Sequence, residues 1–294
     1  MAIFSFLSPF FLAVVCVLII IILQSMKKTD AKKGKGENTA RAESRPWVDE
    51  DLKDSTELLA EDEEKDEWQD TDEENLTHVP FSPRRYSEQE MLKRSKEFYE
   101  LLNQRRSVRF ISDEAIPREV IDNIIRAAGT SPSGAHTEPW TFVVVENPEV
   151  KHKIREIIEE EEEINYQKRM GDKWVNDLKK LKTDWVKEYL DTAPYLILIF
   201  KQVYGIISNN RKKTHYYNEI SVSIACGILL AAIQNAGLVT VTTTPLNCGP
   251  RLRLLLERPV NEKLLMLLPV GYASKDATVP DLQRKPLEDV MVVV

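Results

Sequence analysis

The residues in this 294-residue chain that are best suited to bind an anion lie in one basic pentapeptide. Its members are Arg105, Arg106, Ser107, Val108 and Arg109. Guanidinium groups bind phosphate through paired, charge-assisted hydrogen bonds, and the serine adds a hydroxyl. Such a pentapeptide is on its own more often a solvated surface patch. It therefore indicates a phosphate site only if other residues that suit a cofactor accompany it.

A short turn could supply backbone amides to the same ligand. Residues 132–135 read Pro-Ser-Gly-Ala and follow a predicted helix that ends at Gly129. The amides of Ser133, Gly134 and Ala135 could approach a ring or a phosphate closely, although turns of this composition are also common without any ligand.

Three consecutive threonines, Thr242, Thr243 and Thr244, end an apolar stretch that reads as a strand. Their hydroxyls would then point at whatever lies at the edge of the sheet. The ordinary alternative is that threonine simply favours strands. Arg284 near the C-terminus adds one more cation, and it too is a typical surface residue when considered alone.

A highly charged segment, residues 159–187, contains Glu162, Tyr166 and Lys187. Glu162 and Tyr166 are four residues apart and would share one helical face, while Lys187 lies on the next predicted helix. From the residues alone, a solvated and salt-bridged pair of helices is the preferred interpretation.

Several familiar sites are disfavoured by the sequence. There is no G-x-G-x-x-G after a strand, no phosphate-binding G-x-x-x-x-G-K-[ST] loop and no H-E-x-x-H. The four histidines lack the spacing of metal ligands, and the three cysteines form neither a disulfide framework nor a CxxC pair. We therefore expect no nicotinamide Rossmann site and no metal.

The elements that must position these residues alternate between helices and strands. Helices are predicted at residues 87–104, 117–128, 148–170, 172–191, 216–235 and 251–256. Strands are predicted at residues 141–145, 196–200, 238–243 and 264–270, with a further edge strand near Ile111. This order predicts a three-layer α/β (α+β) fold, in which helices flank both faces of a mixed central sheet.

The N-terminal part of the chain predicts a membrane anchor. Residues 2–23 carry no charge, and 22 helical residues span roughly 33 Å, enough for a bilayer core. A cleaved signal peptide is the rival, but it would need a basic start and a small-residue cleavage site. Lysines follow from Lys27 to Lys35, which predicts a single-pass protein of the plasma membrane or a vesicle membrane with a cytosolic domain.

Residues 49–74 hold fifteen acidic residues and two lysines, with almost no aliphatic periodicity. Such a composition cannot bury enough surface to fold and is usually just solvated. We therefore expect an anchor (residues 1–24), a basic then acidic flexible tether (25–85) and one folded domain (86–294). The folded part is nearly neutral, which argues against a nucleic-acid partner.

The basic pentapeptide, the turn, the threonines and the late arginine together resemble the nitroreductase-like flavoproteins. Within that superfamily, residues 45–49, 133–140, 159–166 and 240–250 are similar to the iodotyrosine deiodinases, and the similarity extends over essentially the whole chain. The resemblance implies the three-layer nitroreductase-like fold and a homodimer with FMN at its interface.

The resemblance also implies a role for each candidate residue. It assigns FMN binding to Arg105, Arg106, Ser107, Val108, Arg109, Ser133, Gly134, Thr242, Thr243, Thr244 and Arg284. Thr244, or as the alternative Thr243, would lie near flavin N5. The Ala135 amide would bind the substrate phenolate and act with these threonines in catalysis. Glu162, Tyr166 and Lys187 would bind the amino-acid end of the substrate.

The activity implied is the reductive deiodination of free mono- and diiodotyrosine to tyrosine and iodide. NADPH would be the ultimate reductant, with a separate flavin reductase as one route, since no nicotinamide fingerprint is present. One alternative is a broad-specificity FMN nitroreductase or quinone reductase, which needs no charged clamp. Another is a flavin-free, membrane-tethered scaffold that acts through its acidic tether.

Overall fold

The computed structural model describes residues 77–207 and 211–294. The predicted anchor and most of the predicted tether lie outside the described residues. All described residues belong to one compact unit of the chain.

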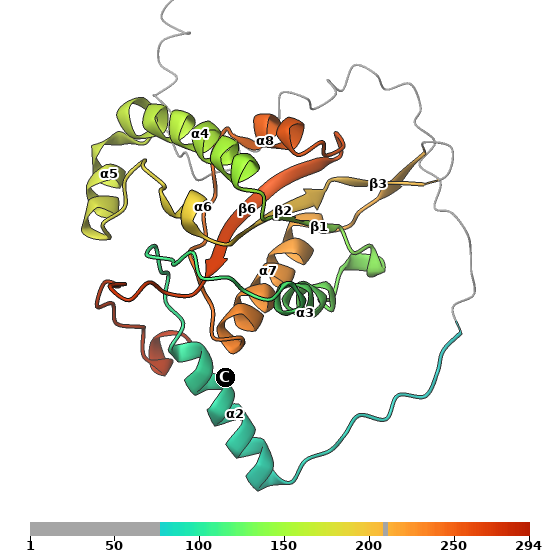
Figure 1. Ribbon diagram of the computed structural model, residues 1–294. Coiled ribbons are helices and arrows are strands. Elements are labelled where there is room, and N and C mark those ends of the chain that lie inside the picture. Colours follow the sequence, from blue (N-terminus) through green and yellow to red (C-terminus); the bar gives the residue numbers. More distant parts are fainter. Residues whose placement is uncertain (1–76, 208–210) are drawn as a thin grey trace, which may run out of the picture. The chain divides into compact units, whose positions relative to one another are not determined.

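The centre of this unit is a four-stranded sheet with the order β1-β2-β6-β5 (Figure 1). Its strands are β1 (Trp140–Val145), β2 (Tyr195–Gln202), β6 (Glu262–Gly271) and β5 (Val239–Thr240). All three pairings in this sheet are antiparallel, and the one parallel contact among the described residues is an isolated bridge between Ser107 and Thr240. The sequence predicted a mixed sheet, with parallel and antiparallel strand pairs. Within the described residues this is wrong, because every pair of neighbouring strands is antiparallel. Strand order is set by long-range pairing, which a local apolar run does not encode.

Strand β2 explains why helices must cover both faces. Residues 196–200 are all fully buried. Alternate side chains belong to different cores: Ile197 and Ile199 pack on one face, whereas Leu198 and Phe200 pack on the other. This is the two-residue alternation of a strand that is covered on both sides.

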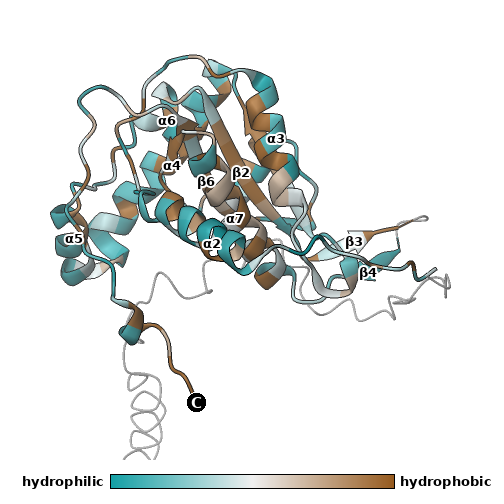
Figure 2. Ribbon diagram, turned by 90° about the horizontal axis from the view of Figure 1, so that it is seen from below, coloured by the Kyte–Doolittle hydropathy of each residue, from teal (hydrophilic) through white to brown (hydrophobic). Residues whose placement is uncertain are grey.

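Helices α3 (Arg118–Gly129) and α7 (Asn218–Asn235) cover the first face. Helices α4 (Pro148–Ile164), α6 (Tyr189–Thr192) and α8 (Gly249–Leu255) cover the second. Figures 1 and 2 show the apolar strands between these layers, which confirms the predicted three-layer arrangement. Of the described helices, α7 alone is apolar and long enough to span a membrane, but its buried face belongs to the core of this unit.

Local signals account for the helix that carries the charged segment. Asn147 caps α4 by accepting hydrogen bonds from the amides of Glu149 and Val150, at 2.9 and 3.1 Å. Pro148 occupies the first turn, where its missing N–H has no effect. Ile154 and Ile158 then bury the helix against the sheet.

The next predicted helix, residues 172–191, is wrong in its second half. Helix α4 leads into a π-helical turn, η3 (Asn165–Arg169), and then into α5 (Gly171–Lys180). The amide of Thr183 donates to the carbonyl of Leu178 at 3.1 Å, and that of Lys182 donates to Lys179 at 2.9 Å. These are the two hydrogen bonds of a Schellman motif, with Lys182 at a φ of 51° where glycine is usual. Lys187 consequently lies in the connection before α6 and not within a helix.

Helix α2 (Glu88–Asn103) begins as predicted, since the Ser87 hydroxyl accepts from the Glu90 amide at 3.3 Å. None of its residues is buried in this chain, and Phe98 and Tyr99 are more than half exposed. The remaining elements are the hairpin β3 (Tyr204–Ile206) and β4 (Lys212–Thr214) and two short 3-10 turns, η2 (Gly134–His136) and η5 (Leu287–Asp289). The predicted edge strand near Ile111 is a single antiparallel bridge to Ala273.

Candidate functional site

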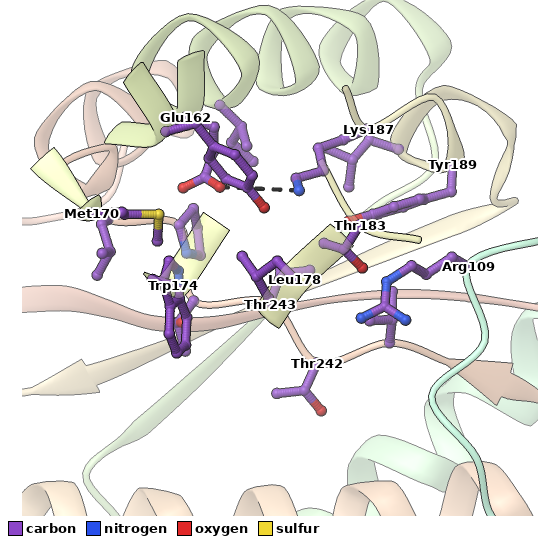
Figure 3. Close-up of a pocket in the computed structure, with 17 residues that line it drawn as sticks. Arg109, Glu162, Met170, Trp174, Leu178, Thr183, Lys187, Tyr189, Thr242 and Thr243 are labelled. Carbon is purple, nitrogen blue, oxygen red and sulfur yellow. Dashed lines mark ion pairs between the residues drawn. The ribbon is translucent and has the colours of Figure 1, made fainter. Parts of the chain in front are cut away.

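A cavity of about 230 Å³ lies where three parts of the chain meet (Figure 3). One wall is formed by α4, the π turn and α5, and a second by residues 183–190. The third is the segment after β5, residues 241–246, which includes Thr242, Thr243 and Thr244. The predicted strand 238–243 is therefore a two-residue strand followed by a single bridge from Thr243 to Leu267. Arg109 completes the lining. The structure thus brings together predicted residues that are up to 135 positions apart.

The cavity contains a buried pair of opposite charges. Lys187 Nζ lies 4.0 Å from Glu162 Oε2, and the two side chains are only 8% and 11% exposed. Lys187 also lies over the Tyr166 ring, 5.6 Å from its centroid. At this separation the two groups attract each other but are not in close hydrogen-bonding contact. A ligand with both charges could therefore bind each of them.

Burial dominates the protonation of this pair. It raises the pKa of Glu162, and the nearby Lys187 cation partly opposes the shift. It lowers the pKa of Lys187, and Glu162 partly opposes that shift. Both groups are held away from water and are incompletely compensated by one another. An ammonium and a carboxylate supplied by a ligand would compensate both.

The π turn places Tyr166 beside Glu162. A π-helical turn widens the helix by one residue and is frequent at functional sites. Asn165 starts the turn and is 1% exposed, and its amide donates to Glu162 Oε1 at 3.4 Å. Arg169 closes the turn from the other end, donating to Asn165 Oδ1 at 2.8 Å and to Glu161 Oε2 at 3.0 Å.

Of the three threonines that line the cavity opposite the charged pair, Thr243 differs from its neighbours in the hydrogen bonds it makes. The Thr243 amide donates to the Leu267 carbonyl at 3.0 Å, and its hydroxyl donates to the same oxygen at 2.9 Å. The Thr243 proton is therefore used inside the sheet. Thr242 and Thr244 line the cavity on either side of it.

The basic residues form a separate, cationic region. Burial lowers the pKa of Arg105, and the guanidinium groups of Arg284 and Arg106 add to this shift. Arg284 is held there by hydrogen bonds to Asn103 Oδ1 at 3.0 Å and to the Arg105 carbonyl at 2.8 Å. Three cations thus share one small region, a donor set that fits a phosphate dianion.

Arg109 connects the two regions. It lines the main cavity and also a smaller cavity of about 120 Å³ that includes Ser107 and Pro280. Arg106 donates to the carbonyl of Pro280 beside this smaller cavity. Val108 differs from its neighbours, because its side chain is buried and its amide donates to the Thr240 carbonyl at 3.0 Å. Val108 therefore fixes the pentapeptide to the sheet.

The turn with Ser133, Gly134 and Ala135 does not line the main cavity. The Gly134 amide donates to the Ser221 hydroxyl of α7 at 3.4 Å, and a Cβ at Gly134 would lie 2.8 Å from the carbonyl oxygen of Tyr216. Ala135 has a φ of 49°, a left-handed conformation that costs energy for a residue with a side chain. The predicted site is therefore divided into a cavity and a separate strained turn.

The sequence reasoning missed an apolar wall of the cavity. Met170, Trp174 and Leu178 all line it, together with Thr183 and Tyr189. The first three are spaced by four residues, which is the stripe of an amphipathic helix and could have been read from the sequence. Thr183 follows the end of α5 and Tyr189 is the first residue of α6, where the sequence predicted one continuous helix. No periodic pattern in the sequence indicates that they line the cavity.

Comparisons with known proteins agree with this geometry. The Nitroreductase family model matches residues 102–272. The chain is 71% identical over 289 residues to iodotyrosine deiodinase 1 of Homo sapiens, covering 98% of this chain and 99% of the relative. It is 67% identical over 299 residues to iodotyrosine deiodinase of Danio rerio, covering 100% of both.

Solved structures show the same fold. A crystal structure of oxidized iodotyrosine deiodinase bound to FMN and 3-iodo-L-tyrosine superimposes with a TM-score of 0.57 at 30% identity, covering 67% of this chain and 97% of that one. A BluB-like flavoprotein from Clostridium difficile 630, at 20% identity and a TM-score of 0.54, shares the fold alone. These matches define a nitroreductase-like α/β protein. The chain belongs to the nitroreductase family and, within it, to the iodotyrosine deiodinases.

Proposed function

We propose that the protein catalyses the FMN-dependent reductive deiodination of free mono- and diiodotyrosine. The observation that carries this proposal is the buried Glu162–Lys187 pair, whose charged atoms are 4.0 Å apart. The pair lines the same cavity as Thr242, Thr243 and Thr244. In the reaction an aryl C–I bond breaks and a C–H bond forms, while two electrons and one proton enter and iodide leaves. The relatives named above support the same activity.

FMN is proposed to bind with its phosphate at the cationic region and its ring system in the main cavity. Arg105, Arg106 and Arg284 suit the phosphate, and Arg109 with Ser107 suits the connection between the two cavities. When bound, FMN supplies the two electrons in single-electron steps. Thr244 is proposed to hydrogen-bond flavin N5, with Thr243, whose hydroxyl donates to the Leu267 carbonyl, as the alternative.

Substrate recognition is proposed to depend on charge complementarity. Glu162 would accept hydrogen bonds from the substrate ammonium, and Lys187 would donate to its carboxylate. Tyr166 would add a hydroxyl and a ring wall. The substrate phenolate is proposed to accept a hydrogen bond from the Ala135 amide, which would favour a keto-like ring from which iodide can leave.

A second copy of the chain is proposed to complete the site. Ser133, Gly134 and Ala135 lie on a turn that does not reach the cavity of their own chain. Helix α2 buries none of its residues, and the C-terminal residues 290–294 are apolar and exposed. Such surface suits an interface between copies. Sedimentation of the FMN-loaded protein as a monomer would contradict this arrangement.

The remaining organisation is also a proposal. Residues 1–24 would anchor the chain in a plasma or vesicle membrane, residues 25–85 would form the tether, and residues 86–294 would be the cytosolic catalytic domain. NADPH would supply electrons, directly or through a separate flavin reductase.

The decisive experiment is anaerobic turnover. FMN-loaded protein reduced with dithionite is mixed with diiodotyrosine, and iodide and tyrosine are measured. We expect one iodide for every two electrons. Reduction of nitro compounds without any iodide release would favour a broad-specificity reductase. A purified protein that gains no flavin absorbance on addition of FMN would favour the scaffold alternative.

A further inference from the structure

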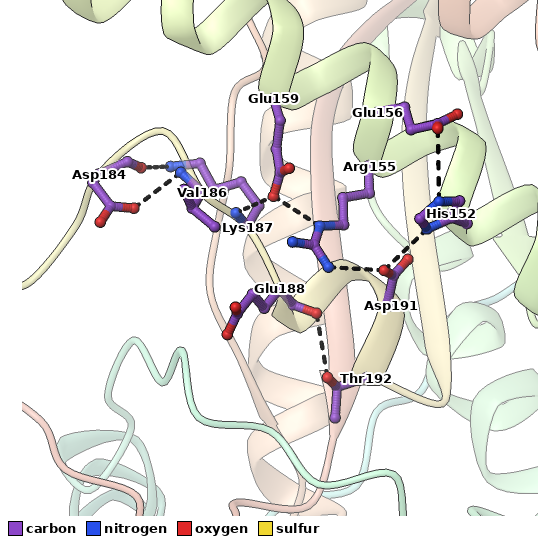
Figure 4. A network of polar contacts seen from close by, with 10 residues as sticks. All are labelled: His152, Arg155, Glu156, Glu159, Asp184, Val186, Lys187, Glu188, Asp191 and Thr192. Atoms are coloured by element: carbon purple, nitrogen blue, oxygen red, sulfur yellow. Dashed lines mark hydrogen bonds and ion pairs between the residues drawn. The ribbon is translucent and has the colours of Figure 1, made fainter.

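A polar network outside the cavity holds the backbone of Lys187 (Figure 4). The Lys187 amide donates to Glu159 Oε1 at 2.6 Å. The same carboxylate oxygen accepts from Arg155 Nε at 2.8 Å. Hydrogen bonds to an ionised carboxylate are shorter and stronger than those between neutral groups. Glu159 is therefore strongly bonded to both a helix side chain and the connection that carries Lys187.

Arg155 extends the network to α6. Its Nη1 donates to Asp191 Oδ2 at 2.9 Å, and His152 Nδ1 lies 3.2 Å from the same oxygen. The side chains of Arg155 and Glu159 are only about one fifth exposed, at 22% and 20%. Arg155 thus joins α4 to α6, which directly follows the connection that carries Lys187.

The network is not needed to hold α4 itself. Ile154 and Ile158, 0% and 3% exposed, already fix that helix against the sheet. The connection before α6 is held less firmly by its own hydrogen bonds. The Val186 amide donates to Asp184 Oδ1 at 2.9 Å, and Lys187 Nζ donates to the Asp184 carbonyl, so these bonds stay within the connection. The contact of Glu159 with the Lys187 amide attaches the backbone of this connection to the rigid helix α4.

We propose that Glu159, held by Arg155, is a positioning residue that aims the Lys187 ammonium at the substrate carboxylate. Glu159 and Lys187 act from opposite sides of the connection: one carboxylate fixes the backbone outside the cavity, while the ammonium 4.0 Å from Glu162 faces inward. The inference rests on the proposed binding of the amino-acid end of the substrate by Glu162 and Lys187.

The experiment compares four single variants and one double variant of the FMN-loaded protein. Glu159→Ala removes the acceptor, whereas Glu159→Gln keeps a carbonyl oxygen for the Lys187 amide. Glu160→Ala is the matched control, because the adjacent Glu160 forms an exposed ion pair with Arg251 at 2.8 Å. Lys187→Gln removes the ammonium. Affinities for 3-iodotyrosine and for 2-iodophenol, which has no amino-acid end, are measured by flavin titration. Hydrogen exchange of the Lys187 amide is measured without substrate.

Glu159→Ala should weaken 3-iodotyrosine binding about tenfold and leave 2-iodophenol within about twofold. It should also accelerate exchange of the Lys187 amide. Glu159→Gln should recover most of both losses, and Glu160→Ala should change neither. In the Lys187→Gln background, Glu159→Ala should cause little further loss of affinity, because Glu159 acts through Lys187.

Two results overturn the inference while leaving the binding role of Lys187 intact. One is an unchanged exchange rate at Lys187 in Glu159→Ala, which would mean that the carboxylate does not hold the connection. The other is full additivity of the two substitutions, which would mean that Glu159 acts by another route. A Lys187→Gln variant with wild-type affinity for 3-iodotyrosine would instead refute the binding role of Lys187 itself, and the inference would fall with it.

Discussion

Two charged regions of the molecule differ in a way that matches two different ligands. The region of Arg105, Arg106 and Arg284 contains three cations that repel one another. The pair in the cavity is balanced, with one carboxylate and one ammonium that are both buried. A dianion such as a phosphate compensates an excess of positive charge. A zwitterion compensates a separated pair, because it brings one charge of each sign. The charge that each region leaves uncompensated therefore predicts the charge of its ligand.

The largest expected effect is a loss of FMN affinity that leaves the affinity for 3-iodotyrosine unchanged. Arg105→Ala should weaken FMN binding about ten- to hundredfold, because each charge-assisted bond to phosphate contributes about 1.5–3 kcal/mol. Once FMN is saturating, the affinity for 3-iodotyrosine should be unchanged. Fluorescence titration of FMN measures the first effect.

Arg118→Ala serves as the control for that variant. Arg118 is an exposed arginine whose ion pair with Asp122, at 2.8 Å, is made on the surface of α3. It should leave FMN binding unchanged. If Arg105→Ala lowers the melting temperature but not the FMN affinity, the arginine is structural. The cationic region would then not be the phosphate site.

A smaller effect should distinguish the regions by pH. The pKa of Glu162 is raised by burial, so its carboxylate is lost at a higher pH than that of an ordinary glutamate. Binding of the substrate ammonium requires the ionised form. The affinity for 3-iodotyrosine should therefore fall several-fold as pH decreases through this raised pKa. Arginine side chains stay charged over this range, so the cationic region itself contributes no such decrease.

Glu162→Gln tests whether Glu162 causes that decrease. At neutral pH it should bind 3-iodotyrosine about tenfold more weakly, since a charge-assisted bond is lost. Its affinity should then be nearly independent of pH over the same range. An identical acidic decrease in the variant would assign the titration to another group.

How far the sequence predicts these regions depends on whether the signal is local. Strand β2 and helices α3 and α7 follow apolar runs and caps within their own residues, and each was predicted close to its observed bounds. The end of α5 was missed because a lysine, Lys182, occupies the left-handed position that glycine normally marks. The separation of Gly134 from the threonines depends on how distant elements pack. No periodicity within the turn could have indicated it.

The smallest expected effect concerns stability, and it tests whether the balanced pair exists for binding. Glu162 has a raised pKa in the folded protein, so its contribution to stability decreases as pH rises through that pKa. Lys187 has a lowered pKa, so its contribution decreases as pH falls through that pKa. In the interval where both are ionised, the pair opposes folding. Replacing a buried ion pair by neutral groups of similar size is often neutral or stabilising.

The double variant Glu162→Gln with Lys187→Met should therefore be more stable at neutral pH, by about 1 kcal/mol, or an increase of roughly 2–4 °C in melting temperature. The same variant should lose its preference for 3-iodotyrosine over 2-iodophenol while it retains FMN. Thermal unfolding of the FMN-loaded protein, measured without substrate, checks the first statement, and flavin titration checks the second. A double variant that is several kcal/mol less stable would show that the pair supports the fold. The Glu162–Lys187 pair would then be a structural ion pair, and its charges would not indicate a zwitterionic ligand.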